Sequence, residues 1–140
     1  MLEYKASTTI NAPKETIWKI LTHAPDYPQW DPSVERIEGT IAAGQKIKAY
    51  TKLQPGRAFP AKVAVFEPNQ KMVWSGGMPL GLFKGERTFW LKDGANGSVE
   101  FAMSEVFSGP LLPLFRKSIP NLTPTFEAFA AGLKARAEGQ

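Results

Sequence analysis

The chain contains no cysteine, only one histidine and no long uninterrupted apolar segment. Without cysteine there can be no disulfide, no thiolate metal site and no cysteine nucleophile. Because His23 is the only imidazole, a metal site built from several histidines is excluded as well. No apolar run approaches the roughly 18 residues needed to cross a bilayer. We therefore expect no transmembrane segment, no metal or other cofactor, and a cytoplasmic location.

The net charge is small for a protein that binds nucleic acid. The chain of 140 residues carries 17 basic and 13 acidic side chains, a formal charge of +4. The basic residues are spread over the predicted strands and loops and form no dense stripe among aromatic residues. We expect no nucleic-acid partner, and the length fits a single domain over residues 1–140 that can bury its own core.

The N-terminal third predicts a strand followed by two short helical segments. Residues 10–21 read Ile-Asn-Ala-Pro-Lys-Glu-Thr-Ile-Trp-Lys-Ile-Leu. Pro13 suits the first helical position, where its missing N–H costs nothing. Ile17, Trp18 and Leu21 then share one helix face. The prolines between Pro25 and Pro32 interrupt this periodicity and predict a second turn or short helix.

The middle of the chain predicts a meander of antiparallel strands. Alternating segments occupy residues 45–53, 61–65, 70–75, 84–92 and 99–107. In the first segment the alternation directs Ile47 and Leu53 to the covered face, and in the second it directs Val63 and Val65 there. Residues 93–97, Asp-Gly-Ala-Asn-Gly, predict a hairpin loop.

The C-terminal segment carries an apolar stripe with helical spacing. Its members are Leu112, Phe115, Ile119, Leu122, Phe126, Phe129 and Leu133. The spacing predicts one helix, kinked near Pro120 and curved around the sheet. The proline signals also permit two helices, the second capped by Thr123 with Pro124 in its first turn.

Several motifs occur in an order that resembles one known family. They are Ala-Pro-x-x-x-Ile-Trp-x-x-Leu from Ala12, Tyr-Pro-x-Trp-Asp-Pro from Tyr27, the meander, a glycine-rich connection and a final helix. This order resembles the polyketide cyclase/dehydrase group of the START-like superfamily (SRPBCC). The resemblance implies an α+β helix-grip fold, in which a curved seven-stranded antiparallel sheet wraps around a long C-terminal helix. Two short helices follow the first strand, and an apolar cavity lies between sheet and helix.

The family does not imply one function, so function must come from the site. The residues expected to line the cavity are Ala49, Thr51, Ala61, Val63, Trp74, Arg87, Phe89, Phe101, Met103, Glu105, Ile119, Leu122 and Phe126. The residues expected to form a lid on a glycine-rich loop are Met78, Leu80, Leu82 and Phe83. Plain core packing and a permanently packed loop are the alternative interpretations of these two sets. No catalytic residue is assigned, because His23 follows the first helix and suits capping or simple exposure.

Two charged residues break the apolar rule on the inward face. Arg87 is in register with Phe89, and Glu105 is in register with Met103. An isolated buried charge is costly, and the hairpin places these residues on adjacent strands, so we expect them to pair. Arg87 would orient a carboxylate or carbonyl of a ligand while Glu105 holds Arg87 in place. A purely structural pair, or a bulge that turns one residue out, is the alternative.

The sequence thus predicts a protein that binds a small hydrophobic or amphipathic molecule in an internal cavity. Two other classes stay open: a polyketide aromatase/cyclase-type enzyme, and a protein-binding domain that resembles the co-chaperone branch. The sequence does not specify the ligand, the reaction, the partner or the oligomeric state.

Overall fold

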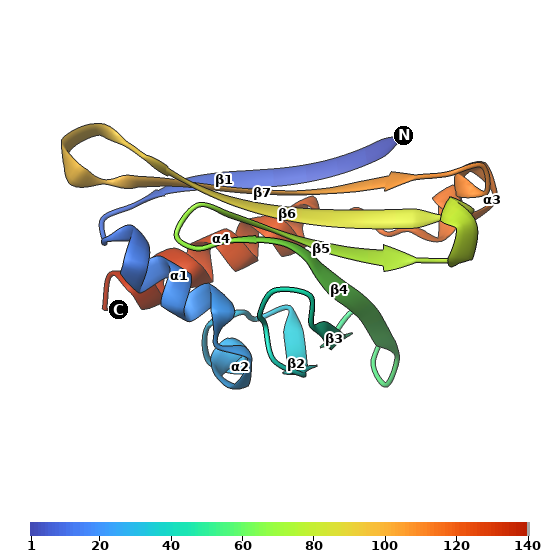
Figure 1. The fold of residues 1–140 in the computed structure, drawn as a ribbon, viewed down its shortest axis with the longest axis horizontal. Helices are drawn as coiled ribbons and strands as arrows, with labels where there is room; N and C mark the ends of the chain where they lie inside the picture. The colour runs from blue at the N-terminus through green and yellow to red at the C-terminus, as the bar shows by residue number, and fades with distance from the viewer. Residues whose placement is uncertain (140) are drawn as a thin grey trace.

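Seven antiparallel strands form one curved sheet in the computed structural model, which describes residues 1–139 (Figure 1). The strand order across the sheet is β1-β7-β6-β5-β4-β3-β2. The strands are β1 (Leu2–Ile10), β2 (Val34–Glu38), β3 (Lys46–Thr51), β4 (Ala58–Glu67), β5 (Lys71–Gly77), β6 (Lys84–Asp93) and β7 (Val99–Ser108). Every strand from β2 to β7 pairs with its neighbour in sequence, as the predicted meander requires, and β1 closes the far edge against β7.

Two N-terminal helices and the long C-terminal helix lie on one side of this sheet, and a further short helix lies at its end (Figure 1). After β1 come α1 (Lys14–Thr22), a 3₁₀ turn η1 (Ala24–Asp26) and α2 (Tyr27–Trp30). Single 3₁₀ turns, η2 (Pro79–Gly81) and η3 (Ala95–Gly97), connect β5 to β6 and β6 to β7. After β7 come α3 (Leu112–Phe115), η4 (Arg116–Ser118) and α4 (Thr123–Ala137). Helix α4 packs chiefly against β1 and also contacts α1, α2 and β7. The helix-grip architecture expected from the resemblance is confirmed.

Aromatic side chains from the sheet and the helices meet around Phe129 of α4. The ring centroid of Phe129 lies 4.9 Å from that of Trp30, 5.6 Å from Phe89 and 6.1 Å from both Tyr27 and Phe101. All five side chains are buried. The interior under the middle of α4 is therefore filled by packed rings, which hold α2 against the sheet and α4.

Two of the predicted inward positions in the strands are wrong. A β-bulge between Val63 and Val65 shifts the pairing of β4, so that Val65 pairs with Val73 and Phe66 pairs with Met72. The extra residue moves Phe66 into the core in place of Val65. Strand β3 ends at Thr51, and Leu53 lies in the following connection with 53% of its surface exposed.

The C-terminal segment forms two helices and not one kinked helix. Ile119 precedes Pro120 and has extended backbone angles, φ −86° and ψ 118°, as the proline ring requires of the residue before it. Pro124 lies in the first turn of α4, as the two-helix alternative predicted. Thr123 does not cap this helix: its own N–H donates to Asn121 Oδ1 at 3.1 Å. The break leaves residues 119–122 as an irregular segment before α4.

Candidate functional site

A row of polar side chains crosses the inner face of four adjacent strands. The strand register pairs Trp74 with Arg87, Arg87 with Glu105, and Glu105 with Tyr4. These residues come from β5, β6, β7 and β1, and they point to the same side of the sheet as the buried Phe89 and its neighbours. Among residues 1–139, no other row of paired inward positions combines an indole, a guanidinium, a carboxylate and a phenol.

Arg87 and Glu105 form the predicted ion pair. The Nε–H of Arg87 donates to Glu105 Oε1 at 2.7 Å, and the side chains are 25% and 15% exposed. The Arg87 guanidinium also lies 5.0 Å from the ring centroid of Phe126, at the start of α4. A guanidinium has five N–H donors. Within the described residues the four N–H groups on the Nη atoms have no hydrogen-bond acceptor, so they are free to bind another group.

Trp74, which pairs with Arg87 across β5 and β6, carries a donor without a partner. Its side chain is buried, at 5% exposure, and its Nε1–H has no hydrogen-bond partner. A buried donor without an acceptor costs about 1–3 kcal/mol. This donor lies inside the core, away from any surface that a ligand could cover in this conformation.

Small residues lie next to the polar row, toward the end of the sheet that carries α3. The next inward positions are Ala61 on β4, Gly76 on β5 and Gly85 on β6. A Cβ atom at Gly85 would lie 3.3 Å from the ring of Phe107, which covers this glycine from β7. A Cβ atom at Gly76 would lie 2.6 Å from the Pro60 carbonyl oxygen, so the β4 backbone and the Phe107 ring fill the space over these two glycines.

The predicted cavity residues divide into two groups. Fully buried in the core are Val63, Trp74, Phe89, Phe101, Met103 and Phe126. Partly exposed around the polar row, or beyond it, are Ala49, Thr51, Ala61, Arg87, Glu105, Ile119 and Leu122. Only the second group has surface that a ligand could cover in this conformation.

The predicted lid residues lie in the connection between β5 and β6. Leu80 is 96% exposed, and Met78 and Leu82 are 41% and 36% exposed. Phe83 instead packs inward, with its ring centroid 5.2 Å from that of Phe115 and 6.0 Å from that of Phe107. In this conformation Leu80 covers no part of the polar row.

Two surface pockets lie apart from the polar row. The first, of about 400 Å³, is lined by Lys19, Ile20, Thr22, His23, Asp26, Trp30 and Arg136. The second, of about 580 Å³, is lined by Pro28, Gln29, Trp30, Pro32, Lys52, Ala128, Ala131 and Gly132. Neither contains a predicted ligand residue. His23 occupies the C-cap position of α1, and its ring is exposed, with Nε2 3.8 Å from Asp26 Oδ2.

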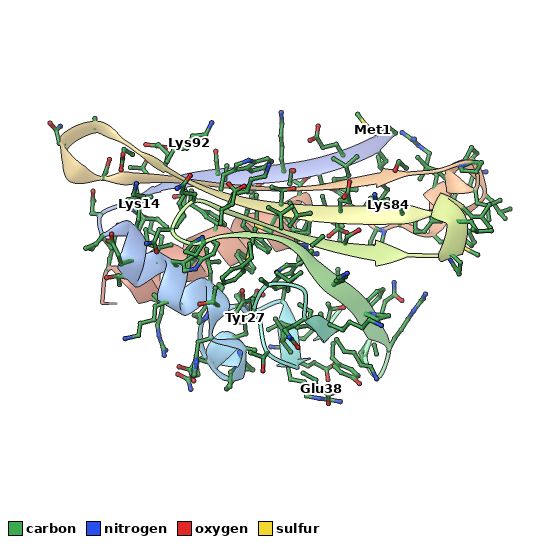
Figure 2. The ribbon with its side chains drawn as sticks, viewed as in Figure 1. Met1, Lys14, Tyr27, Glu38, Lys84 and Lys92 are labelled. Carbon is green, nitrogen blue, oxygen red and sulfur yellow. The ribbon has the colours of Figure 1, made fainter. Side chains whose placement is uncertain are left out.

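Asp31 is a buried carboxylate that sequence reasoning missed. It is 4% exposed, and its Oδ1 accepts from the Ser33 N–H at 3.0 Å and the Ser33 hydroxyl at 2.7 Å. Burial raises the pKa of Asp31, and the Ser33 bonds and the Arg87 and Lys52 charges oppose this. Nearby Tyr27 lies between α2 and the sheet (Figure 2) and donates to the Leu21 carbonyl at 2.6 Å. The Asp-Pro-Ser order of residues 31–33 was the signal for this turn.

The Asp31→Asn variant should change how stability depends on pH. Because the pKa of Asp31 is higher in the folded state, the folded protein binds the extra proton. The contribution of Asp31 to stability is therefore greatest below an ordinary aspartate pKa of 3.8 and falls as pH rises through the raised pKa. Asparagine removes this dependence. Urea unfolding from about pH 4 upward should show the variant gaining stability relative to the unchanged protein as pH rises. Parallel curves would contradict the assignment.

Comparisons with known proteins agree with the fold. The family model described as polyketide cyclase/dehydrase and lipid transport matches residues 1–138. A search of curated proteins found no match. Among residues 1–139, no helix is long and apolar enough to cross a membrane. Over the same residues, no three or more metal-ligating side chains come together.

Solved structures share the architecture at low sequence identity. A START superfamily protein from Mycobacterium smegmatis is 18% identical, with a TM-score of 0.68, over 98% of this chain and 97% of that one. The Aha1 dimer from Colwellia psychrerythraea is 20% identical, with a TM-score of 0.72, over 99% and 97%. The di-domain ARO/CYC BexL is 11% identical, with a TM-score of 0.71, over 99% of this chain and 47% of that one. At these identities the likeness shows the fold alone.

Proposed function

The chain belongs to the polyketide cyclase/dehydrase and lipid transport family, and from this premise we propose that it binds a small amphipathic molecule on the inner face of its sheet. The Arg87–Glu105 pair carries the proposal. It supplies cationic N–H donors on an otherwise apolar concave surface. Ligand sites in proteins commonly combine an apolar wall with a few such fixed polar groups.

The ligand chemistry follows from the donors that lack acceptors. The Nη groups of Arg87 need oxygen acceptors. Glu105 holds the guanidinium by its Nε–H and leaves the Nη edge for the ligand. A carboxylate, or a carbonyl at the end of an apolar body, satisfies these donors, and the body lies toward Ala61, which is partly exposed.

The filled interior limits the size of the ligand. The rings around Phe129 occupy the space beneath α4, so the ligand lies beyond the start of that helix. Ile119 and Leu122, in the irregular segment before α4, are partly exposed and supply apolar contacts there. No separate observation among residues 1–139 favours the cyclase-type or the co-chaperone-like alternative over binding.

Arg87→Met should weaken an acidic ligand more than its apolar analogue. Isothermal titration calorimetry measures the affinity for a medium-chain fatty acid and for the alkane of the same length, in the variant and in the unchanged protein. A hydrogen-bonded charge pair contributes about 1.5–3 kcal/mol, so the dissociation constant for the acid should rise at least about tenfold. Ala61→Trp should weaken the binding of both probes, because the larger side chain fills the space beside the polar row. Overpacking alone costs about 1–3 kcal/mol, so thermal unfolding is measured alongside.

An equivalent arginine on the outer sheet face supplies the control. Arg36 pairs with Glu38 at 3.0 Å, and both side chains are about half exposed on β2. Arg36→Met removes the same charge without touching the inner face, so affinity for both probes should stay unchanged. Glu105→Gln tests the support given to Arg87. If Arg87→Met and Glu105→Gln leave affinity for the acid untouched, the proposed site is wrong.

A further inference from the structure

The end of the molecule that carries α3 exposes a cluster of large aliphatic side chains. Six large apolar residues of the described chain are exposed, and four of them lie here. Leu80 is 96% exposed and Leu114 is 71% exposed, with Met78 at 41% and Leu82 at 36%. We call these four residues the apolar tip. In Figure 1 the β5–β6 connection and α3 lie side by side at one end of the sheet.

The two segments of the apolar tip are fixed to each other. The Leu111 N–H donates to the Leu82 carbonyl at 2.9 Å. A Cβ atom at Gly109 would lie 2.6 Å from that same carbonyl oxygen, so only glycine permits this approach. Beneath them the ring of Phe83 packs against Phe107 and Phe115. The exposed leucines therefore project from a rigid aromatic base.

Leu80 gains no intramolecular packing from its position. Its backbone has φ 62° and ψ 20°, the left-handed region that a leucine rarely adopts. This conformation carries its side chain almost completely into water. A disfavoured backbone with no compensating contact inside the protein indicates a contact outside it.

The two segments that form the apolar tip carry charge of one sign only. Residues 76–85 and 106–126 contain no aspartate or glutamate. They carry Lys84, Arg116 and Lys117, of which Lys84 forms an ion pair with Glu86 at 3.4 Å. Lys84 lies at the end of the sheet beside this tip, whereas Lys92 lies at the opposite end (Figure 2). Arg116 and Lys117 are exposed and have no acidic partner among residues 1–139.

We propose that the apolar tip docks reversibly on a bilayer that contains anionic lipid. Projecting aliphatic side chains bury in the region between headgroups and acyl chains, while Arg116 and Lys117 contact the phosphates. The surface favours lipid over a protein partner, because its exposed large side chains are all aliphatic. It lacks the aromatic anchors and the fixed polar contacts typical of specific protein interfaces. This proposal does not depend on the ligand site at Arg87.

Sedimentation with unilamellar vesicles tests the docking. The full chain should bind vesicles of phosphatidylcholine with about one third phosphatidylglycerol, and bind pure phosphatidylcholine vesicles more weakly. Replacing both leucines, Leu80→Ser with Leu114→Ser, should lower the partition coefficient about tenfold or more. Leu53→Ser is the matched control, because Leu53 is also exposed but lies in the β3–β4 connection. That variant should bind as the unchanged protein does.

A second pair of variants tests the charge. Arg116→Gln with Lys117→Gln should lower binding to the anionic vesicles about tenfold, and added salt should have a similar effect. Lys46→Gln with Lys62→Gln is the control, since these exposed lysines pair across β3 and β4 on the outer face. All substitutions are at exposed positions, and circular dichroism checks the fold. The proposal is overturned if the unchanged protein does not sediment with anionic vesicles, or if the leucine double variant binds equally well.

Discussion

Phe129→Ala is expected to lower the free energy of unfolding by about 3–5 kcal/mol. The side chain is 2% exposed, and its ring meets Trp30 and Tyr27 on one side and Phe89 and Phe101 on the other. Alanine leaves a cavity between the sheet and the N-terminal helices, which cannot collapse because both walls are held by other contacts. Urea-induced unfolding followed by far-UV circular dichroism measures the loss.

Glu127→Ala is the matched control for this substitution. Glu127 lies two residues earlier in α4 and is exposed, so its removal should change stability by less than about 0.5 kcal/mol. A loss below about 1 kcal/mol for Phe129→Ala would contradict a filled interior. In that case the ligand-accessible space would extend beneath α4, and the site would be larger than the one proposed around Arg87.

The strand faces could be predicted from the sequence because side chains alternate with a period of two. This period placed Arg87 and Glu105 on one face, and the hairpin at residues 93–97 set their register. The same reasoning failed at Val65, because a single extra residue in β4 reverses every later position. Nothing in the local pattern marks the bulge, which depends on how β4 and β5 pair.

The start of α4 was the harder prediction. The apolar stripe continues across Pro120, but the backbone restriction on Ile119 ends the helical conformation there. This break determines which part of the inner face α4 covers. The sequence therefore indicated the candidate residues without separating Phe101 and Phe126, which are core, from Ile119 and Leu122, which keep exposed surface.

Other features of the site depend on contacts between distant segments. The unpartnered Trp74 indole and the buried Asp31 turn arise where β5 and α2 approach the same interior. Periodicity reports which face a residue is on, but it does not report whether a donor finds an acceptor. For the same reason the sequence showed the apolar character of Leu80 but not its exposure.

Gly132→Ala is expected to destabilise the protein by at least about 2 kcal/mol. In an isolated helix this substitution would stabilise by about 0.5–1 kcal/mol, because alanine restricts the unfolded chain and favours helix. In α4, however, the added Cβ atom would lie 1.9 Å from the Trp30 carbonyl oxygen and 3.0 Å from its carbon. A backbone carbonyl cannot rotate away as a side chain can, so α2 and α4 must separate.

A separation of α2 from α4 can be told apart from a loss of helix propensity, because only the separation moves Trp30. Moving α2 away from α4 takes the Trp30 ring off Phe129, from which it is 4.9 Å away by centroid distance. Tryptophan fluorescence of the folded variant should then shift to longer wavelength, alongside a lower urea midpoint. Ala131→Gly, at an exposed position of the same helix, should cost only about 1 kcal/mol with no spectral shift. If Gly132→Ala were more stable than the unchanged protein, the close contact between the Trp30 carbonyl of α2 and Gly132 of α4 would be contradicted.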